Sequence, residues 1–344
     1  MVLESATIYR FRLPLRRTLL LNGYRIETRQ GLILRLDAGN GRSGFGECSP
    51  LPGFSHESLD DAFRQLKSVT GQLFRQPDSL DFIVQSGARS GTDQMLFSSV
   101  TCAVESAALD LAGYFHAAPA TPAVCPLLMG TPDEVLTQFA RLPDTSELKL
   151  KVGRARLDDD IAVVNALCEQ GPPYPGLRLD ANRRWTFVEA LRFCRSVDAE
   201  RIAFLEEPLS EYQRLPELGD LTRFPLALDE SLQAPDGDLA IFPGLTALVI
   251  KPMLTGGLFR AHQFIRQARS ASLRAIVSAS YESPPGISQL SCLAQRETPD
   301  ELPGLDTGGA FCASAVERFE SVMLTDFSQQ DPVLEKVWRY TAAH

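Results

Sequence analysis

The stretch ELKLKVG (147–153) is the first of five similar runs, which continue with LRLDAN (177–182), IAFLEEP (202–208), LALDES (226–231) and ALVIKP (247–252). Each run is short and apolar and ends in ionisable residues, and stretches with helical periodicity, such as 157–170, separate the runs. Strands that alternate with helices predict βαβ units and a parallel sheet.

The same rhythm continues on both sides of these runs. Three more runs, AVCPLLMG (123–130), RAIVSAS (274–280) and GLDT (304–307), bring the expected strands to eight. Eight strands at this spacing predict a closed TIM-type barrel of the α/β class, and a chain of 344 residues leaves room for a smaller second domain.

The N-terminal third has a different pattern. Alternating apolar residues and an Asn40-Gly41 turn predict strands, and helical patterns follow from about residue 56 to 118. We therefore expect an α+β capping domain over residues 1–97, a barrel over 98–308, and a C-terminal segment, 309–344, that returns to the capping domain.

Polar and ionisable residues fall at the C-terminal ends of six successive expected strands. In strand order they are Lys149 and Lys151, Asp180 and Asn182, Glu206 and Glu207, Asp229 and Glu230, Lys251, and Ser278. In a barrel of this type those strand ends form the mouth of the active site.

The acids predict a metal site. Asp180, Glu206 and Asp229 come from three adjacent strands, and oxygen ligands of this kind suit Mg²⁺ or Mn²⁺. Without a cation, three converging carboxylates would repel one another and take up protons. Because side chains alternate along a strand, we expect Glu206 rather than Glu207, and Asp229 rather than Glu230, to face inward, although sequence alone leaves that choice open.

The lysines predict a base. Lys149 and Lys151 are two residues apart and so face the same side of one strand, whereas Lys251 comes from a strand across the barrel. A lysine with a pKa near about 10.4 is a poor base at neutral pH, and neighbouring cations lower that pKa. Lys149 is therefore expected to adjust the pKa of Lys151.

This inventory matches removal of a proton next to a carboxylate. A divalent cation on the carboxylate oxygens stabilises the enediolate, Lys151 takes the proton on one face, and Lys251 faces the other. Arg178 shares the inward face of its strand, and it is expected either to meet substrate or Glu206, or to form a structural pair. Asn182 is expected to support the site.

Composition excludes several other functions. The net charge is −9, and Lys/Arg runs do not exceed pairs, which argues against nucleic-acid binding. Seven cysteines without a CxxC pair argue against a disulfide framework or structural zinc. No signal peptide and no membrane-length apolar stretch are evident, so a cytoplasmic protein without membrane contact is expected.

In this order, KLKVG, LRLDAN, LEEP, LALDES and VIKP resemble the enolase superfamily, in its muconate-lactonizing subgroup. GFGECSPLPGFSHESL (44–59), SASYES (278–283) and PGLDT (303–307) are similar to bacterial o-succinylbenzoate synthases in particular. The likeness covers nearly the whole chain. It implies a (β/α)₇β barrel with an α+β capping domain and bound Mg²⁺.

The resemblance also implies an activity. It is the Mg²⁺-dependent dehydration, by syn β-elimination of water, of 2-succinyl-6-hydroxy-2,4-cyclohexadiene-1-carboxylate to 2-succinylbenzoate in menaquinone biosynthesis. By motif match, the metal ligands would be Asp180, Glu206 and Asp229. Lys151 would be the base and return its proton to the leaving hydroxyl, and Lys251 would stay charged against the enediolate.

The same resemblance implies how the small anionic carboxylate substrate is held. Ser278 and Gly304 would meet its succinyl carboxylate through backbone groups. The loop around residues 17–24 and the stretch 51–55 would close over the site.

Two rival functions remain open from the sequence. An N-acyl amino acid racemase or dipeptide epimerase of the same superfamily needs two opposed lysines, and both are present. A non-catalytic ligand-binding barrel is disfavoured because binding alone needs no base. The sequence does not decide between a monomer and a homodimer.

Overall fold

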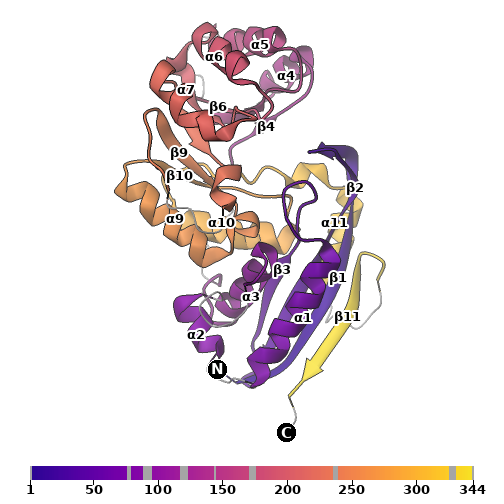
Figure 1. The fold of residues 1–344 in the computed structure, drawn as a ribbon. Helices are drawn as coiled ribbons and strands as arrows, with labels where there is room; N and C mark the ends of the chain where they lie inside the picture. Colours follow the sequence, from indigo (N-terminus) through magenta and orange to yellow (C-terminus); the bar gives the residue numbers. More distant parts are fainter. Residues whose placement is uncertain are drawn as a thin grey trace.

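The computed structural model describes residues 2–75, 79–87, 95–116, 123–142, 145–169, 176–234, 239–324 and 331–342. The chain forms an antiparallel sheet with helices against it, here called the cap, and a curled parallel sheet surrounded by helices, here called the barrel (Figure 1). All seven cysteines are unpaired. Within the described ranges, no helix combines the length and apolar character that a membrane crossing requires.

The cap sheet is built from the two ends of the chain. Its strands, in the order β11-β1-β2-β3, are β11 (Leu334–Thr341), β1 (Leu3–Leu21), β2 (Tyr24–Ala38) and β3 (Ser43–Cys48). The predicted turn at Asn40-Gly41 is confirmed, with Gly41 at φ +77°. The stretch 17–24 is not a loop as predicted, because it continues β1 to a tight turn at Asn22-Gly23.

Three helices cover the cap sheet: α1 (Leu59–Arg75), α2 (Ser79–Ser86) and α3 (Ser98–Leu111). Glycines on β3 let α3 approach closely, since a Cβ at Gly46 would lie 1.9 Å from the carbonyl oxygen of Ala103. The buried face of α3 belongs to the cap core. We propose that the cap extends through α3 rather than ending at residue 97, and the other predicted boundaries remain predictions.

The barrel sheet has seven parallel strands in sequential order. They are β4 (Leu127–Leu128), β5 (Glu147–Lys151), β6 (Gly176–Asp180), β7 (Ile202–Glu206), β8 (Leu226–Leu228), β9 (Leu245–Ile250) and β10 (Arg274–Val277). The eighth predicted strand, 304–307, forms only an isolated bridge between Gly304 and Ser278. The neighbouring Pro303 carbonyl accepts from the backbone N–H of Cys125, so this short segment joins the two edges of the sheet without a ladder.

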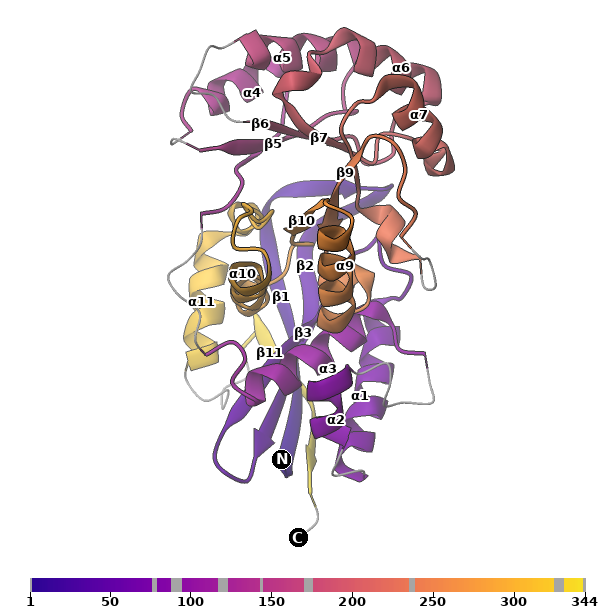
Figure 2. The same ribbon diagram turned by 90° about the vertical axis from the view of Figure 1, so that its left-hand side faces the viewer.

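Most helices follow the strands and bury apolar residues against them: α4 (Pro132–Phe139), α5 (Leu157–Glu169), α6 (Phe187–Ser196), α7 (Leu215–Thr222), α9 (Leu258–Ser270) and α10 (Pro284–Glu297). The short α8 (Pro252–Thr255) follows β9, and α11 (Ala313–Leu324) packs its apolar residues against β1 of the cap. Thr131 and Thr186 start α4 and α6 with reciprocal capping boxes. Figure 2 shows that the β1–β2 pair reaches up to the barrel strands, which brings a cap hairpin to the site described next.

Candidate active site

Strand register brings the predicted site residues to one edge of the barrel. Lys151 on β5 pairs with Asp180 on β6, and Asp180 pairs with Glu206 on β7. Glu206 pairs with Ala227 on β8, and Asp229 follows two residues later on the same face. The three carboxylates therefore come from neighbouring strands, with β5 and β9 as the outer pair that carries the lysines.

The carboxylates and lysines form one buried ion network. Lys149 Nζ lies 2.7 Å from Asp180 Oδ2 and 2.7 Å from Glu206 Oε2. Lys151 Nζ donates to Asp180 Oδ2 at 2.6 Å. Lys251 Nζ donates to Asp229 Oδ2 and lies 3.9 Å from Glu206 Oε1. Burial without these partners would cost several kcal/mol per charge, so the network depends on all of its members.

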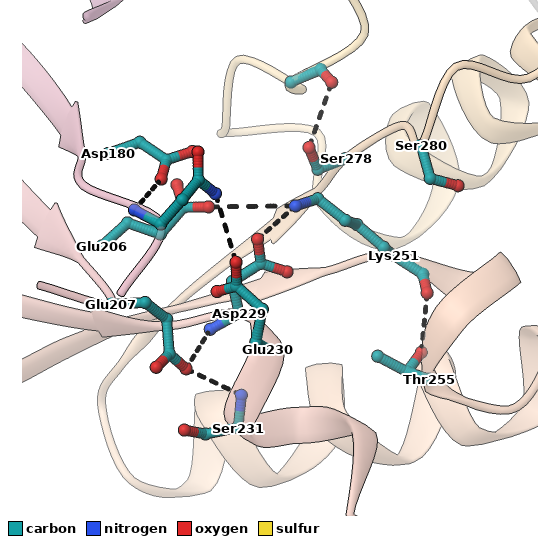
Figure 3. Close-up of polar contacts among 12 residues, drawn as sticks. Asp180, Glu206, Glu207, Asp229, Glu230, Ser231, Lys251, Thr255, Ser278 and Ser280 are labelled. Atoms are coloured by element: carbon teal, nitrogen blue, oxygen red, sulfur yellow. Dashed lines mark hydrogen bonds and ion pairs between the residues drawn. The ribbon is translucent and has the colours of Figure 1, made fainter. Parts of the chain in front are cut away.

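Glu206, the last residue of β7, and the next residue, Glu207, have different contacts, as Figure 3 shows. Glu206 faces the lysines, and its Oε2 lies 2.7 Å from Lys149 Nζ. Glu207 turns away and accepts from the backbone N–H groups of Asp229 (3.1 Å) and Ser231 (2.7 Å). Arg183 Nε also donates to Glu207 at 2.9 Å. Glu207 thus holds the turn that positions Asp229.

In the second acidic pair, Asp229 and Glu230, both side chains contact residues of the site. Asp229 contacts Lys251, whereas Glu230 Oε1 accepts from Asn182 Nδ2 at 3.1 Å. Asn182 Oδ1 also accepts from Lys151 Nζ at 2.7 Å, so Asn182 links the base to Glu230. Sequence reasoning expected Asn182 near the site but did not foresee this link.

Electrostatics separate the lysines. Burial lowers the pKa of Lys151; Asp180 opposes this effect and Lys149 adds to it, so the pKa falls below its ordinary value. Burial also lowers the pKa of Lys149 and of Lys251, but the surrounding carboxylates outweigh it, and both pKa values are raised. Among these three lysines, Lys151 is the one most easily made neutral.

The carboxylates respond to the same surroundings. Burial, reinforced by the charge of Asp180, raises the pKa of Glu206 well above its usual range. Burial also raises the pKa of Asp180, but Lys149 and Lys151 more than offset it and hold that pKa well below its usual value. The raised pKa of Glu206 is what converging acids produce when their charge is not fully neutralised.

The donor set fits a hard divalent cation. Glu206 Oε1 is buried and accepts no hydrogen bond, although its carboxylate lies between the two flanking strands of lysines. Such an orphaned oxygen in an all-oxygen group is a suitable metal ligand. The lysines now contact the acids directly, and no group of three or more His, Cys, Asp or Glu in the described ranges is already arranged around a metal position.

A cavity lies above this network and holds about 680 Å³ of empty space, including its opening to solvent. Lys149, Lys151 and Lys251 form part of its lining, while the three carboxylates lie below. The cap contributes Leu21, Leu51 and Phe54. Both stretches that were expected to cover the site therefore reach the cavity.

Ser278 and Gly304 also line the cavity, but not with free backbone donors. The N–H of Ser278 donates to Ile250 and that of Gly304 to Val277, since both take part in closing the sheet. These two N–H groups are therefore engaged in this structure, and the contact of Ser278 and Gly304 with a carboxylate stays a prediction. The side-chain hydroxyl of Ser278 is also engaged, because it donates to the Gly304 carbonyl at 3.1 Å.

Arg178 is not part of the cavity lining. Its guanidinium pairs with Glu147 and donates to the carbonyl oxygen of Leu302 at 2.7 Å. Of the two outcomes left open, structural pairing is observed and contact with Glu206 is not. Arg178 precedes Asp180 by two residues on β6, so its side chain lies deeper in the barrel. There its guanidinium lies near the carboxylates of Glu147 and Glu301.

The lining residues that the sequence analysis did not assign to the site include Arg154, Tyr281 and Asp306. Arg154 and Asp306 lie beyond the strand ends, and Tyr281 follows β10 at φ +62°, a backbone conformation that aromatic residues rarely adopt. No periodic pattern marks such positions, so only the folded loops reveal them.

A parallel barrel whose rim holds carboxylates on three neighbouring strands between opposed lysines defines an enolase-type protein. Residues 136–304 match the family described as Enolase C-terminal domain-like, and residues 3–86 match the MenC N-terminal domain. The o-succinylbenzoate synthase of Citrobacter koseri is 36% identical over 340 residues, covering 97% of this chain and 100% of that protein. The chain belongs to the o-succinylbenzoate synthase family.

Solved structures share the fold at lower identity. MenC from Desulfotalea psychrophila superposes with a TM-score of 0.73 at 22% identity, covering 90% of this chain and 95% of that chain. An enolase superfamily member from Roseovarius nubinhibens, complexed with magnesium, gives a TM-score of 0.75 at 18% identity, covering 99% of this chain and 94% of that chain.

Proposed function

We propose that this chain is an o-succinylbenzoate synthase, a hydro-lyase that converts 2-succinyl-6-hydroxy-2,4-cyclohexadiene-1-carboxylate to 2-succinylbenzoate. The observation that carries the proposal is the position of Lys151 and Lys251 on strands that flank three buried carboxylates, in a chain similar to such synthases over nearly its whole length. The product is the aromatic acid used in menaquinone biosynthesis.

Asp180, Glu206 and Asp229 would hold Mg²⁺, for which Mn²⁺ would be a substitute. When bound, the cation supplies positive charge to the substrate carboxylate as negative charge develops there. The buried Oε1 of Glu206, which accepts no hydrogen bond, supports this assignment. Release of the acids from Lys149 and Lys151 would also free those lysines to face the cavity that they line.

Lys151 would remove the ring proton next to the carboxylate and then return that proton to the leaving hydroxyl group. Its lowered pKa favours the neutral amine that this step needs. Lys149 lowers that pKa and also contacts Asp180, so it would favour the neutral form of the base. Asn182 accepts from Lys151 and would orient its amine.

Lys251 would remain charged and stabilise the enediolate from the other side. Its raised pKa and its contact with Asp229 support a fixed cation rather than a second base. A racemase would need Lys251 to exchange protons, and the similarity to o-succinylbenzoate synthases over nearly the whole chain favours elimination.

Incubation with the cyclohexadiene substrate tests the proposal directly. Ultraviolet absorbance is expected to change as the aromatic product forms with Mg²⁺, and to stay constant when a chelator is added. No Mg²⁺-dependent change would remove the synthase assignment. N-succinyl amino acids, assayed in parallel for loss of optical rotation, would expose a racemase instead.

Arg154 is expected to bind the succinyl carboxylate of this substrate. It is exposed, lines the cavity and makes no ion pair or hydrogen bond to the described part of the chain. Arg154→Gln should raise KM about tenfold with little change in kcat, since one charge-assisted hydrogen bond at an exposed site is lost. Steady-state kinetics would measure both constants.

Arg156 offers a matched control for that prediction. It is exposed two residues along the same loop but does not line the cavity. Arg156→Gln should leave KM near the wild-type value. Equal effects of the two substitutions would show that the net charge of the loop, rather than a contact at Arg154, attracts the substrate.

A further inference from the structure

We propose that Arg29, a cap residue outside the cavity, is a positioning residue that sets the spacing between the cap wall and the barrel wall of the substrate pocket. This inference rests on the proposed function for its kinetic consequence. Its structural consequence is that residues 49–55 and 278–283 hold each other in place. This consequence does not depend on which substrate the pocket binds.

The contacts of Arg29 are unusual for a buried arginine. The residue lies on β2 and is only 2% exposed. Its guanidinium donates to backbone carbonyl oxygens of two separate segments. From the cap these are Ser49 and Pro50 (2.8 Å), together with its neighbour Gln30 (3.1 Å), and from the barrel they are Tyr281 (3.1 Å) and Ser280 (3.5 Å).

Both segments that Arg29 contacts, 49–50 in the cap and 280–281 in the barrel, continue into or belong to the lining of the pocket. Pro50 precedes Leu51, which lines the cavity, and Phe54 follows three residues later. On the other side, Ser280 and Tyr281 themselves line the cavity. One side chain therefore ties a wall contributed by the cap to a wall contributed by the barrel.

Tyr281 also needs external support for its backbone. Its φ of +62° is rare for a residue with a large side chain, and such a conformation persists only where surrounding contacts fix it. The bond from Arg29 Nε to the Tyr281 carbonyl is one such contact. Loss of this bond would let the tyrosine and its ring move relative to the site.

A second cap residue, Glu47, contacts the same barrel segment at its other end. Glu47 on β3 accepts from the N–H of Ser283 at 3.0 Å, at the start of α10. Gly286 makes room for it, because a Cβ there would lie 2.5 Å from Glu47 Oε2. Glu47 thus anchors the far end of the segment, while Arg29 fixes the part that faces the ligand.

The chemistry explains why arginine is required. A guanidinium offers five N–H donors in a rigid fork, whereas a lysine ammonium offers three from one atom. A lysine at position 29 would keep the charge but could not reach carbonyls on both walls at once. Arg29→Lys therefore removes the link with the smallest change in charge and volume.

Arg35 provides a matched control on the same strand. Its guanidinium donates to Asp37 (2.7 Å) and to Ser43 (3.3 Å), so both contacts remain inside the cap. Arg35→Lys changes the same residue type on β2 without touching either pocket wall.

Kinetics of wild type, Arg29→Lys and Arg35→Lys give the first test. For Arg29→Lys we expect kcat/KM to fall about tenfold to a hundredfold, mainly through KM, since a displaced wall misplaces the substrate. Arg35→Lys should stay close to wild type. Equal kinetics for the two variants, or a loss confined to kcat, would overturn the inference. An inactive wild type would instead refute the proposed function.

Hydrogen–deuterium exchange gives a readout that needs no substrate. In Arg29→Lys, peptides covering 49–55 and 278–283 should both exchange faster, while barrel-strand peptides stay as in wild type. Faster exchange in one segment alone, or throughout the protein, would overturn the inference. If Arg29→Lys does not fold, wild type with and without 2-succinylbenzoate is compared, and protection of only one of the two segments would count against the link.

Discussion

Replacement of Lys151 by alanine is expected to reduce the dehydration rate by about 10³-fold or more, within the range that a positioned general base contributes. Lys151 is the lysine whose pKa is lowered, and it lies 2.6 Å from Asp180 at the rim of the cavity. The surrounding carboxylates raise the pKa values of Lys149 and Lys251, which favours their charged forms. Single-turnover kinetics with saturating Mg²⁺ would measure the loss.

Two further measurements separate the base from a structural role. In the wild type, kcat/KM should rise with pH and level off below the ordinary lysine pKa, because the base must be deprotonated and its pKa is lowered. In Lys149→Met, the plateau should move to higher pH, since Lys149 lowers the pKa of its neighbour. Unchanged substrate proton exchange in Lys151→Ala, with the fold intact, would refute the assignment.

The site could be predicted because its geometry follows from short-range rules. Parallel strands end at the same edge of a sheet, so an acid at the end of LRLDAN and another at the end of LEEP must lie side by side. The observed pairing of Asp180 with Glu206 follows from that rule. The alternation of side chains along a strand also implies that only one of Glu206 and Glu207 faces inward, but it does not say which one.

Other features depended on contacts distant in sequence. Arg178 satisfies the same alternation as Asp180, yet Glu147 holds it deeper in the barrel. The donors of Ser278 and Gly304 could not be assigned before it was known that the eighth run closes the sheet by a single bridge. Arg29 had no local signal at all, because its partners lie about 20 and 250 residues away.

Replacement of Glu206 by glutamine is expected to weaken Mg²⁺ binding more than about a hundredfold, which exceeds what outer partners of a metal site usually contribute. Glu206 lies between the other two carboxylates, and its Oε1 is buried without a hydrogen-bond donor. A neutral amide keeps the shape but removes the charge that a cation needs. Turnover should fall by about 10³-fold for the same reason.

The adjacent glutamate makes this prediction specific. Thermal unfolding of Glu206→Gln in a chelator separates the loss of a metal ligand from the loss of the ion pair with Lys149. Glu207→Gln should instead lose about 1–3 kcal/mol of stability, because Glu207 accepts from two backbone N–H groups and pairs with Arg183. Titration calorimetry with Mg²⁺ and thermal unfolding would measure the two effects. Wild-type Mg²⁺ affinity in Glu206→Gln would exclude this carboxylate as a ligand, and the metal would then have to lie elsewhere on the rim.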